Sequence, residues 1–85
     1  MNTNKINERI IEIENIIEVD MREKEIALLK EKYSLEYRYH GLNERDEAIH
    51  DRIIEIENYL EGEYRDEIDA LYEEKYELYR KLNNN

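Results

Sequence analysis

The residues that could bind a metal ion or move a proton are few. His40 and His50 are the only histidines, and Glu47 precedes His50 by three residues. Side chains three residues apart lie on the same side of a helix, so Glu47 and His50 could ligate one ion. Glu36 is the only other carboxylate expected nearby. Because a Glu-x-x-His pair arises readily in a chain with 23 acidic residues, we expect a solvated histidine near a loop and no bound cofactor.

The spacing of Glu47 and His50 resembles that of the Glu-x-x-His ligands in di-iron carboxylate helix bundles. A short helical hairpin that dimerises around iron would be similar to the encapsulated ferritins. The resemblance covers the residues from Arg45 to His50. It implies, as one alternative function, a ferritin-like iron-binding hairpin.

Catalytic nucleophiles are also scarce. The chain has no cysteine, and Thr3 and Ser34 are its only hydroxyl residues besides tyrosine. Neither belongs to a recognisable motif with a supporting base, and two glycines are too few for a phosphate-binding loop. We therefore expect no enzymatic activity. The lack of cysteine fits a cytoplasmic protein, and no apolar run is long enough to span a membrane.

The chain is an internal duplication with an offset of 43 residues. Copy one (residues 6–38) aligns without gaps to copy two (residues 49–81), and 16 of the 33 aligned positions are identical. The string Arg-Ile-Ile-Glu-Ile-Glu-Asn, for example, begins at Arg9 and again at Arg52. Such self-similarity indicates a repeated structural unit.

Each copy carries an apolar seam with steps of three and four residues, which is typical of a coiled-coil helix. Both seams contain a stutter of successive steps of four, from Ile17 to Glu25 and from Leu60 to Ile68, which locally unwinds a supercoil. Lys32 and Lys75 also fall on the seams, and we expect their ammonium groups to reach water. A second apolar stripe predicts contact with a further helix, and its members are Ile11, Leu29, Tyr33, Ile54, Tyr72 and Tyr76.

The pattern predicts one all-α domain over residues 1–85, a coiled-coil-like hairpin of two long antiparallel helices. The expected bounds are about 5–40 and 44–82, with a turn at about 40–43. In this turn Gly41 would adopt the left-handed conformation and Asn43 would cap the second helix. Antiparallel pairing would bring Met21 near Tyr64. The alternative is a single long coiled-coil helix, because the seam continues in phase through Leu42 and Asp46.

Self-association is expected because a lone two-helix hairpin buries little apolar surface. Two hairpins would form a homodimeric four-helix bundle by covering the second stripe. The residues assigned to this oligomer interface are Ile11, Leu29, Tyr33 and Ile54.

Charge is strongly negative and unevenly shared. The net charge is −10, with −2 in residues 1–42 and −8 in residues 43–85. Such a chain is repelled by nucleic acid and by anionic membranes, so the expected partner is a protein with a basic surface. Tyrosine is enriched where proteins meet. The predicted partner-binding surface comprises Glu63, Asp66, Glu67, Asp69, Tyr72, Glu73, Glu74, Tyr76, Glu77 and Tyr79.

These features favour a non-enzymatic interaction module that acts through self-association and through binding of a protein partner. The first alternative is a small acidic inhibitor that occupies a basic nucleic-acid-binding groove. In size, charge and lack of enzyme motifs the chain resembles phage proteins of the anti-restriction and anti-CRISPR kind. An acidic helical chaperone for a basic client, similar to histone chaperones, follows the same logic.

Overall fold

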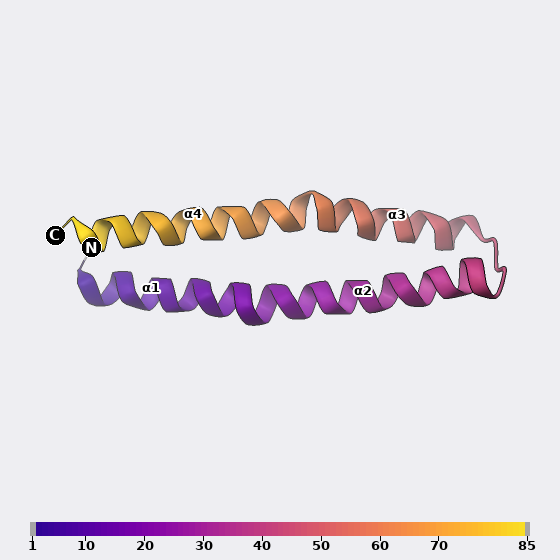
Figure 1. Cartoon of the computed structure of the whole chain (residues 1–85), viewed down its shortest axis with the longest axis horizontal. Coiled ribbons are helices and arrows are strands. Elements are labelled where there is room, and N and C mark those ends of the chain that lie inside the picture. The colour runs from indigo at the N-terminus through magenta and orange to yellow at the C-terminus, as the bar shows by residue number, and fades with distance from the viewer. Residues whose placement is uncertain (1, 85) are drawn as a thin grey trace.

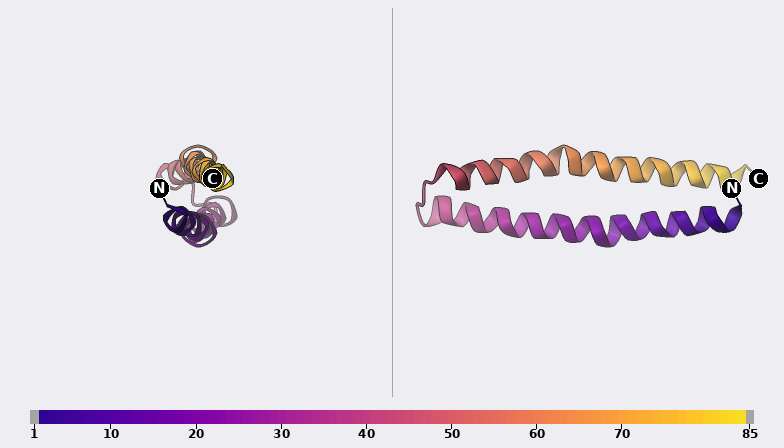
Figure 2. Two further views of the ribbon diagram at one scale, coloured as in Figure 1. Left: turned by 90° about the vertical axis from the view of Figure 1, so that its left-hand side faces the viewer. Right: turned by 180° about the vertical axis from the view of Figure 1, so that it is seen from behind.

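The computed structural model describes residues 2–84 and shows a helical hairpin (Figures 1 and 2). Two long arms run antiparallel, so the start of the first arm lies beside the end of the second. The hairpin prediction is therefore confirmed. No strand occurs within these residues, and the molecule measures 61 × 18 × 13 Å. In chain order the elements are α1 (Thr3–Asn15), the π-helical segment η1 (Ile16–Met21), α2 (Arg22–Glu36), the π-helical segment η2 (Tyr37–Gly41), α3 (Glu47–Glu61) and α4 (Glu63–Asn83).

The turn differs from its prediction in both capping residues. Gly41 lies inside η2, and Asn43 instead adopts the left-handed conformation with φ 59°. Asp46, not Asn43, caps α3, and its side chain accepts a hydrogen bond of 2.9 Å from the Ala48 amide. Asparagine tolerates a positive φ and aspartate is a strong N-cap, so the turn lies over residues 42–46.

The core is the predicted seam between the two arms. Ile13 and Ile56, which occupy equivalent positions in the two copies, are 0% and 1% exposed. The other buried side chains all belong to the same seam: Ile6, Ile10, Met21, Ile49, Ile53, Tyr64 and Leu78. A single seam between two helices leaves no second layer, so the remaining seam residues stay partly exposed.

The two stutters take different forms in the two copies. In copy one η1 contains part of the stutter, because the wider turn of a π-helix brings residues four apart closer to one line. In copy two the arm is interrupted at Gly62, whose φ of −108° and ψ of −95° are not helical. A β-carbon on Gly62 would lie 3.1 Å from the Asn58 carbonyl oxygen. Val19 occupies the equivalent position in copy one, so the interruption at Gly62 is specific to copy two.

The predicted meeting of the stutters is confirmed by a hydrogen bond. The Tyr64 hydroxyl lies 2.9 Å from the Met21 carbonyl oxygen and 2.8 Å from Glu25 Oε2. It donates to these acceptors from a side chain that is only 6% exposed. Burial and the neighbouring Glu25 carboxylate raise the pKa of Tyr64 to about 12, so this hydroxyl stays protonated at neutral pH.

Contacts between the arms obey a pseudo-two-fold axis. The Arg9 guanidinium binds Glu74 with distances of 2.6 and 2.9 Å, and the equivalent Arg52 binds Glu31 with distances of 2.7 and 2.9 Å. A second pair of contacts repeats in the same way. Lys75 lies 3.3 Å from Glu14, and Lys32 lies 3.3 Å from Glu57. The duplicated helix is therefore complementary to its own copy.

At the axis itself the two copies differ. Lys24 and Glu67 occupy equivalent positions and face each other at 3.9 Å. Met21 and Tyr64 are likewise equivalent, and they share the hydrogen bond described above. If copy one paired with another copy one, Lys24 would face Lys24 and the tyrosine hydrogen bond would be lost. The centre of the seam therefore favours pairing of unlike copies.

Replacing Tyr64 with phenylalanine should lower the stability of the hairpin. The ring and its packing would remain, but a buried hydrogen bond would be lost, at a cost of about 1 kcal/mol. For a chain of this size that cost corresponds to a fall of about 4–8 °C in the midpoint of thermal unfolding. Circular dichroism at 222 nm can follow the transition.

Tyr59→Phe is the matched control. The Tyr59 hydroxyl is buried and has no hydrogen-bond partner in the structure, so its removal should leave the midpoint unchanged or raise it. Equal losses in the two variants would contradict the role assigned to the Tyr64 hydroxyl.

Candidate protein-interaction surfaces

One broad side of the hairpin carries cross-arm ion pairs, and we name it the ion-pair face. It is defined by Arg9 with Glu74, Arg52 with Glu31, and Lys24 with Glu67. Hydrogen bonds from Arg9 and Arg52 hold the pKa of Glu74 and of Glu31 below the ordinary value. The side chains of these two Arg–Glu pairs are 34–42% exposed. Water screens such pairs, so they set the register of the arms more than they add stability.

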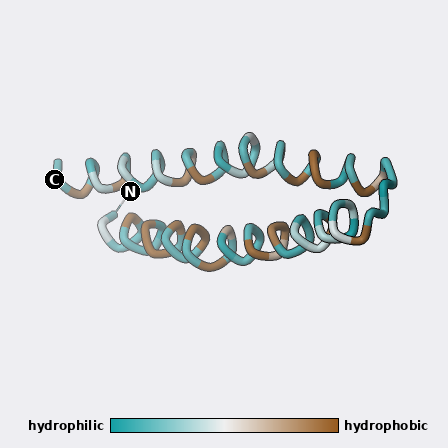
Figure 3. Tube along the Cα trace, turned by 45° about the vertical axis from the view of Figure 1, so that its right-hand side comes forward, coloured by the Kyte–Doolittle hydropathy of each residue, from teal (hydrophilic) through white to brown (hydrophobic). Residues whose placement is uncertain are grey.

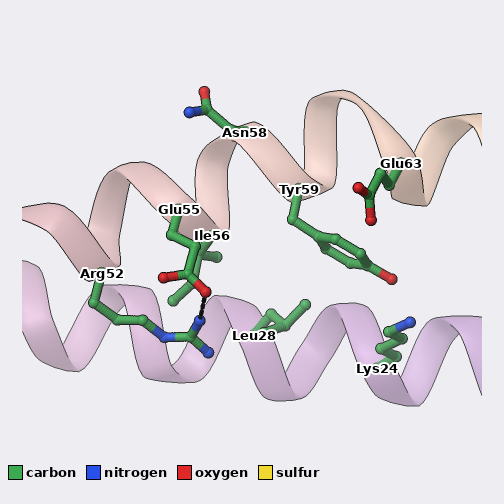
Figure 4. Close-up of a pocket in the computed structure, with 8 residues that line it drawn as sticks. All are labelled: Lys24, Leu28, Arg52, Glu55, Ile56, Asn58, Tyr59 and Glu63. Atoms are coloured by element: carbon green, nitrogen blue, oxygen red, sulfur yellow. Dashed lines mark hydrogen bonds and ion pairs between the residues drawn. The ribbon is translucent and has the colours of Figure 1, made fainter.

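A shallow groove of about 530 Å³ lies on the ion-pair face (Figure 4). Leu28 and Ile56 contribute apolar surface from the two arms, and the Tyr59 ring lies between them and Lys24. The Lys24 ammonium lies 4.8 Å from the centre of that ring. A second groove of about 340 Å³ has Leu71 at the position equivalent to Leu28. Both are depressions along the seam, and the cations at the first already have carboxylate partners.

The opposite broad side, which we name the apolar face, carries the second stripe. Helical spacing places its members on one flank of each arm. Several are well exposed, with values of 57% for Ile11, 60% for Tyr33, 40% for Ile54 and 59% for Tyr76. Leu29 is half-buried. Figure 3 shows apolar residues recurring between polar ones along both arms.

Lys75 links the seam to the apolar face. Its ammonium contacts Glu14 of the other arm and lies 6.0 Å and 5.9 Å from the ring centres of Tyr72 and Tyr79. Tyr79 reaches across the seam, and its hydroxyl lies 3.3 Å from Glu14 Oε1. The seam lysines Lys32 and Lys75, whose ammonium groups were expected to reach water, are 21% exposed and bind carboxylates of the other arm. Burial lowers the pKa of Lys75, but the Glu14 carboxylate together with Tyr79 and Tyr72 raises it above its ordinary value.

The predicted acidic surface divides into two groups. Glu67 and Glu74 face the other arm and bind Lys24 and Arg9. By helical spacing the others lie mainly along the outer side of α4, away from the seam, where they are exposed. We name this side the acidic edge and define it by Asp66, Asp69, Glu73 and Glu77. Glu77 binds Arg80, whereas within residues 2–84 the other three have no cationic partner within 4.0 Å. Glu63 is also exposed and lines the groove of Figure 4.

Glu47 and His50 lie at the loop end of α3, and both are exposed. His50 packs against the ring of Tyr39, with centres 5.5 Å apart. Within the described part of the chain, no three histidine, aspartate or glutamate side chains come together in a way that could hold a metal ion.

The cross-arm pairs escaped the sequence analysis, although a signal for them was present. Arg9 and Glu31 recur as Arg52 and Glu74 at the repeat offset, and antiparallel pairing of equivalent helices places each arginine beside the glutamate of the other copy. Charged residues that repeat at flanking positions of a duplicated seam are therefore candidates for cross-arm contacts.

Acidification should destabilise the hairpin partly through Glu31 and Glu74. Their pKa values in the folded protein lie below the ordinary 4.5, so the unfolded chain takes up protons first as the pH falls. Their stabilising effect is complete above pH 4.5 and is lost as the pH falls through the lowered values. The melting midpoint of Glu31→Gln/Glu74→Gln should therefore fall less steeply below pH 4.5 than that of the wild type.

The control replaces Glu8 and Glu23 with glutamine. Both are exposed, and within residues 2–84 neither lies within ion-pair distance of a cation. This variant removes the same charge but should keep the steep acid slope. If the two double variants show the same slope, the Arg–Glu pairs do not govern the acid response.

No helix in the described part of the chain is both long enough and apolar enough to cross a membrane. Comparison of the chain with protein-family models, with curated proteins and with solved structures found no match.

Proposed function

We propose that this hairpin is a protein-interaction module without catalytic activity, which self-associates through its apolar face and binds a basic protein through its acidic edge. The observation that carries the proposal is the outer side of α4. There Asp69 and Glu73 stand where copy one has Ile26 and Lys30, and neither acid serves a contact between the arms.

Self-association is supported by what the single hairpin leaves exposed. Its core is one seam, and the apolar face presents large side chains to solvent, among them Ile11, Tyr33 and Tyr76. Tyr72 and Tyr76 stack with ring centres 6.4 Å apart, which gives this face a flat aromatic area. Its lysines are matched locally, since Lys32 and Lys75 each bind a glutamate. Two apolar faces can therefore meet without bringing unpaired lysines together.

A second molecule of this protein is the partner that fits the apolar face. Because the seam contacts obey a pseudo-two-fold axis normal to the hairpin plane, the face has nearly equivalent stripes on both arms. Two such faces can meet in register and form a four-helix bundle. Tyr72, Tyr76 and Tyr79 would then belong to the homodimer interface.

The acidic edge stays accessible in this dimer. Its centre lies about a quarter-turn of α4 away from the apolar face, so face-to-face association leaves Asp66 and Glu73 in water, whereas Asp69 lies at the border of the interface. Carboxylates without cationic partners attract basic surfaces and speed encounter with them. The dimer presents the edge twice, which favours a partner with repeated or symmetric basic surface.

An inhibitor that fills a nucleic-acid-binding groove is the second candidate, and the same edge supports it. The spacing of the negative charges along the acidic edge distinguishes docking on a basic protein from mimicry of a nucleic acid. Four acids from Asp66 to Glu77 span about 16 Å at a helical rise of 1.5 Å per residue, whereas duplex DNA carries a charge every 1.7 Å or so. The edge is sparser than a nucleic acid, so docking on a basic protein surface is the function we favour over close mimicry of DNA.

The apolar face is tested by Ile11→Glu/Ile54→Glu. Both side chains are exposed in the single hairpin, so the variant should keep its helicity, but charges would enter the dimer interface. Light scattering should show a change from dimer to monomer, and the concentration dependence of the melting midpoint should disappear. A wild-type protein that stays monomeric at all concentrations would contradict self-association.

The acidic edge is tested by Asp66→Lys/Asp69→Lys/Glu73→Lys. Affinity capture from the native host, with mass spectrometry, should recover basic proteins with the wild type and lose them with this variant. Capture by the wild type should also weaken as salt rises, because charge complementarity is screened.

The matched control is Glu8→Lys/Glu18→Lys/Glu23→Lys, which changes the net charge equally but lies on copy one, where all three acids are exposed. This variant should retain the captured proteins. If both triple variants recover the same proteins in the same amounts, the acidic edge is not a binding surface.

A further inference from the structure

The loop that joins the arms contributes nothing to the core. Every residue from His40 to Ala48 is exposed, and Leu42 is 53% exposed. The polar contacts of the loop are local, such as Glu44 N to the Arg38 carbonyl oxygen at 2.9 Å and Arg38 Nε to Glu44 Oε2 at 3.0 Å. The arms can therefore separate at the loop without exposing a buried loop residue.

The same segment is also compatible with a helix. It reads Leu-Asn-Glu-Arg-Asp and contains no proline or glycine. The seam passes through it in phase, from Tyr39 to Leu42, Asp46 and Ile49, in steps of three and four. A continuous helix over this segment would carry one unbroken seam. To join such a helix, Asn43 must leave the left-handed region, where its φ is 59°, and Asp46 must leave the extended region, where its ψ is 129°.

The centre of the seam determines which helices can pair. Lys24 faces Glu67, and Met21 accepts a hydrogen bond from Tyr64, so copy one matches copy two and not itself. This requirement can be met within one chain or between two chains. When two opened chains lie antiparallel, copy one of each packs on copy two of the other. Every contact between the arms is then reproduced, and the assembly closes as a dimer.

We propose that two copies of this chain exchange arms about residues 42–46 and form an extended antiparallel rod. In this rod the two chains contact each other through the seam. The exchanged dimer is therefore distinct from the four-helix bundle proposed above, which uses the apolar face, and does not depend on it. If the register of the hairpin is kept in the rod, Leu42 lies near the two-fold axis that relates the two chains. There it would pack on the seam of the other chain, whereas the hairpin leaves it in water.

The balance between the hairpin monomer and the exchanged dimer depends on the protein concentration and on the conformation of the loop. A short loop holds the arms at an effective concentration of roughly millimolar, so the hairpin dominates in dilute solution. Refolding at millimolar protein concentration, or a loop that disfavours the turn, should shift the population to the exchanged dimer.

Asn43 offers a matched pair of variants. Asn43→Ala raises the energetic cost of the left-handed conformation that the turn needs at position 43, whereas Asn43→Gly lowers that cost. Because each dimer releases two loops, we expect Asn43→Ala to raise the association constant for exchange about thirtyfold, which is about 2 kcal/mol. Asn43→Gly should lower it. Size-exclusion chromatography with light scattering, after refolding over a range of concentrations, measures these constants.

Small-angle X-ray scattering identifies the form. The hairpin is 61 Å long, and a face-to-face bundle keeps about that length, whereas a continuous helix of some 80 residues extends about 120 Å at 1.5 Å per residue. The proposal requires the Asn43→Ala dimer to be about twice the length of the monomer. A dimer of hairpin length, or a monomer at every concentration, would overturn it.

Leu42→Glu provides the second variant. It lies in water in the hairpin, so the monomer should keep its stability, but it brings two glutamates together at the two-fold axis of the rod. Combined with Asn43→Ala it should remove most of the exchanged dimer. If the combined variant dimerises as strongly as Asn43→Ala alone, Leu42 is not at the axis and the rod is wrong. Should Asn43→Ala lose helicity, wild-type protein refolded at millimolar concentration gives the same test of length.

Discussion

The structure depends on the packing of two unlike copies of one helix along a single apolar seam. The isoleucines that repeat in both copies supply the burial, with Ile13 and Ile56 almost fully enclosed. Near the pseudo-two-fold axis the copies have diverged, so that Lys24 meets Glu67 and Tyr64 binds the Met21 carbonyl. Burial holds the arms together, and these few polar contacts set their register and the identity of the paired copies.

Away from the pseudo-two-fold axis, the two copies resemble each other where they contact each other and differ on their outer sides. The Arg–Glu pairs and the repeated seam isoleucines away from the axis need complementarity between copies, and they have the same residues at equivalent positions. The outer side of each arm is free of that constraint. There copy two has gained acids such as Glu73, whereas copy one keeps Lys30. Part of the asymmetry of net charge, −2 against −8 for residues 1–42 and 43–85, lies in the cross-arm pair of Lys24 and Glu67. The part on the outer side of α4 serves no contact between the arms, and that part we assign to a partner.

Periodicity predicted the arms, the seam and the meeting of Met21 with Tyr64, because hydrophobic spacing and antiparallel geometry determine these features together. The details of the turn were mispredicted, since Gly41, Asn43 and Asp46 compete for the same capping roles within six residues, and small local energies decide among them. Nor could the pattern distinguish a π-helical segment from an interruption at Gly62. The apolar face and the acidic edge were predicted as residues, but their separation on α4 requires the packed hairpin.

Pulsed electron paramagnetic resonance between spin labels at positions 5 and 81 tests the central claim most directly. Both side chains are exposed, and the chain has no native cysteine to interfere with labelling. In dilute solution, with excess unlabelled protein, unlike copies paired within one chain bring the two labels to the same end of the hairpin. Their separation should then be comparable to its 18 Å width. A continuous helix would place them about 114 Å apart, and the absence of a short distance would contradict pairing of the two copies within one chain.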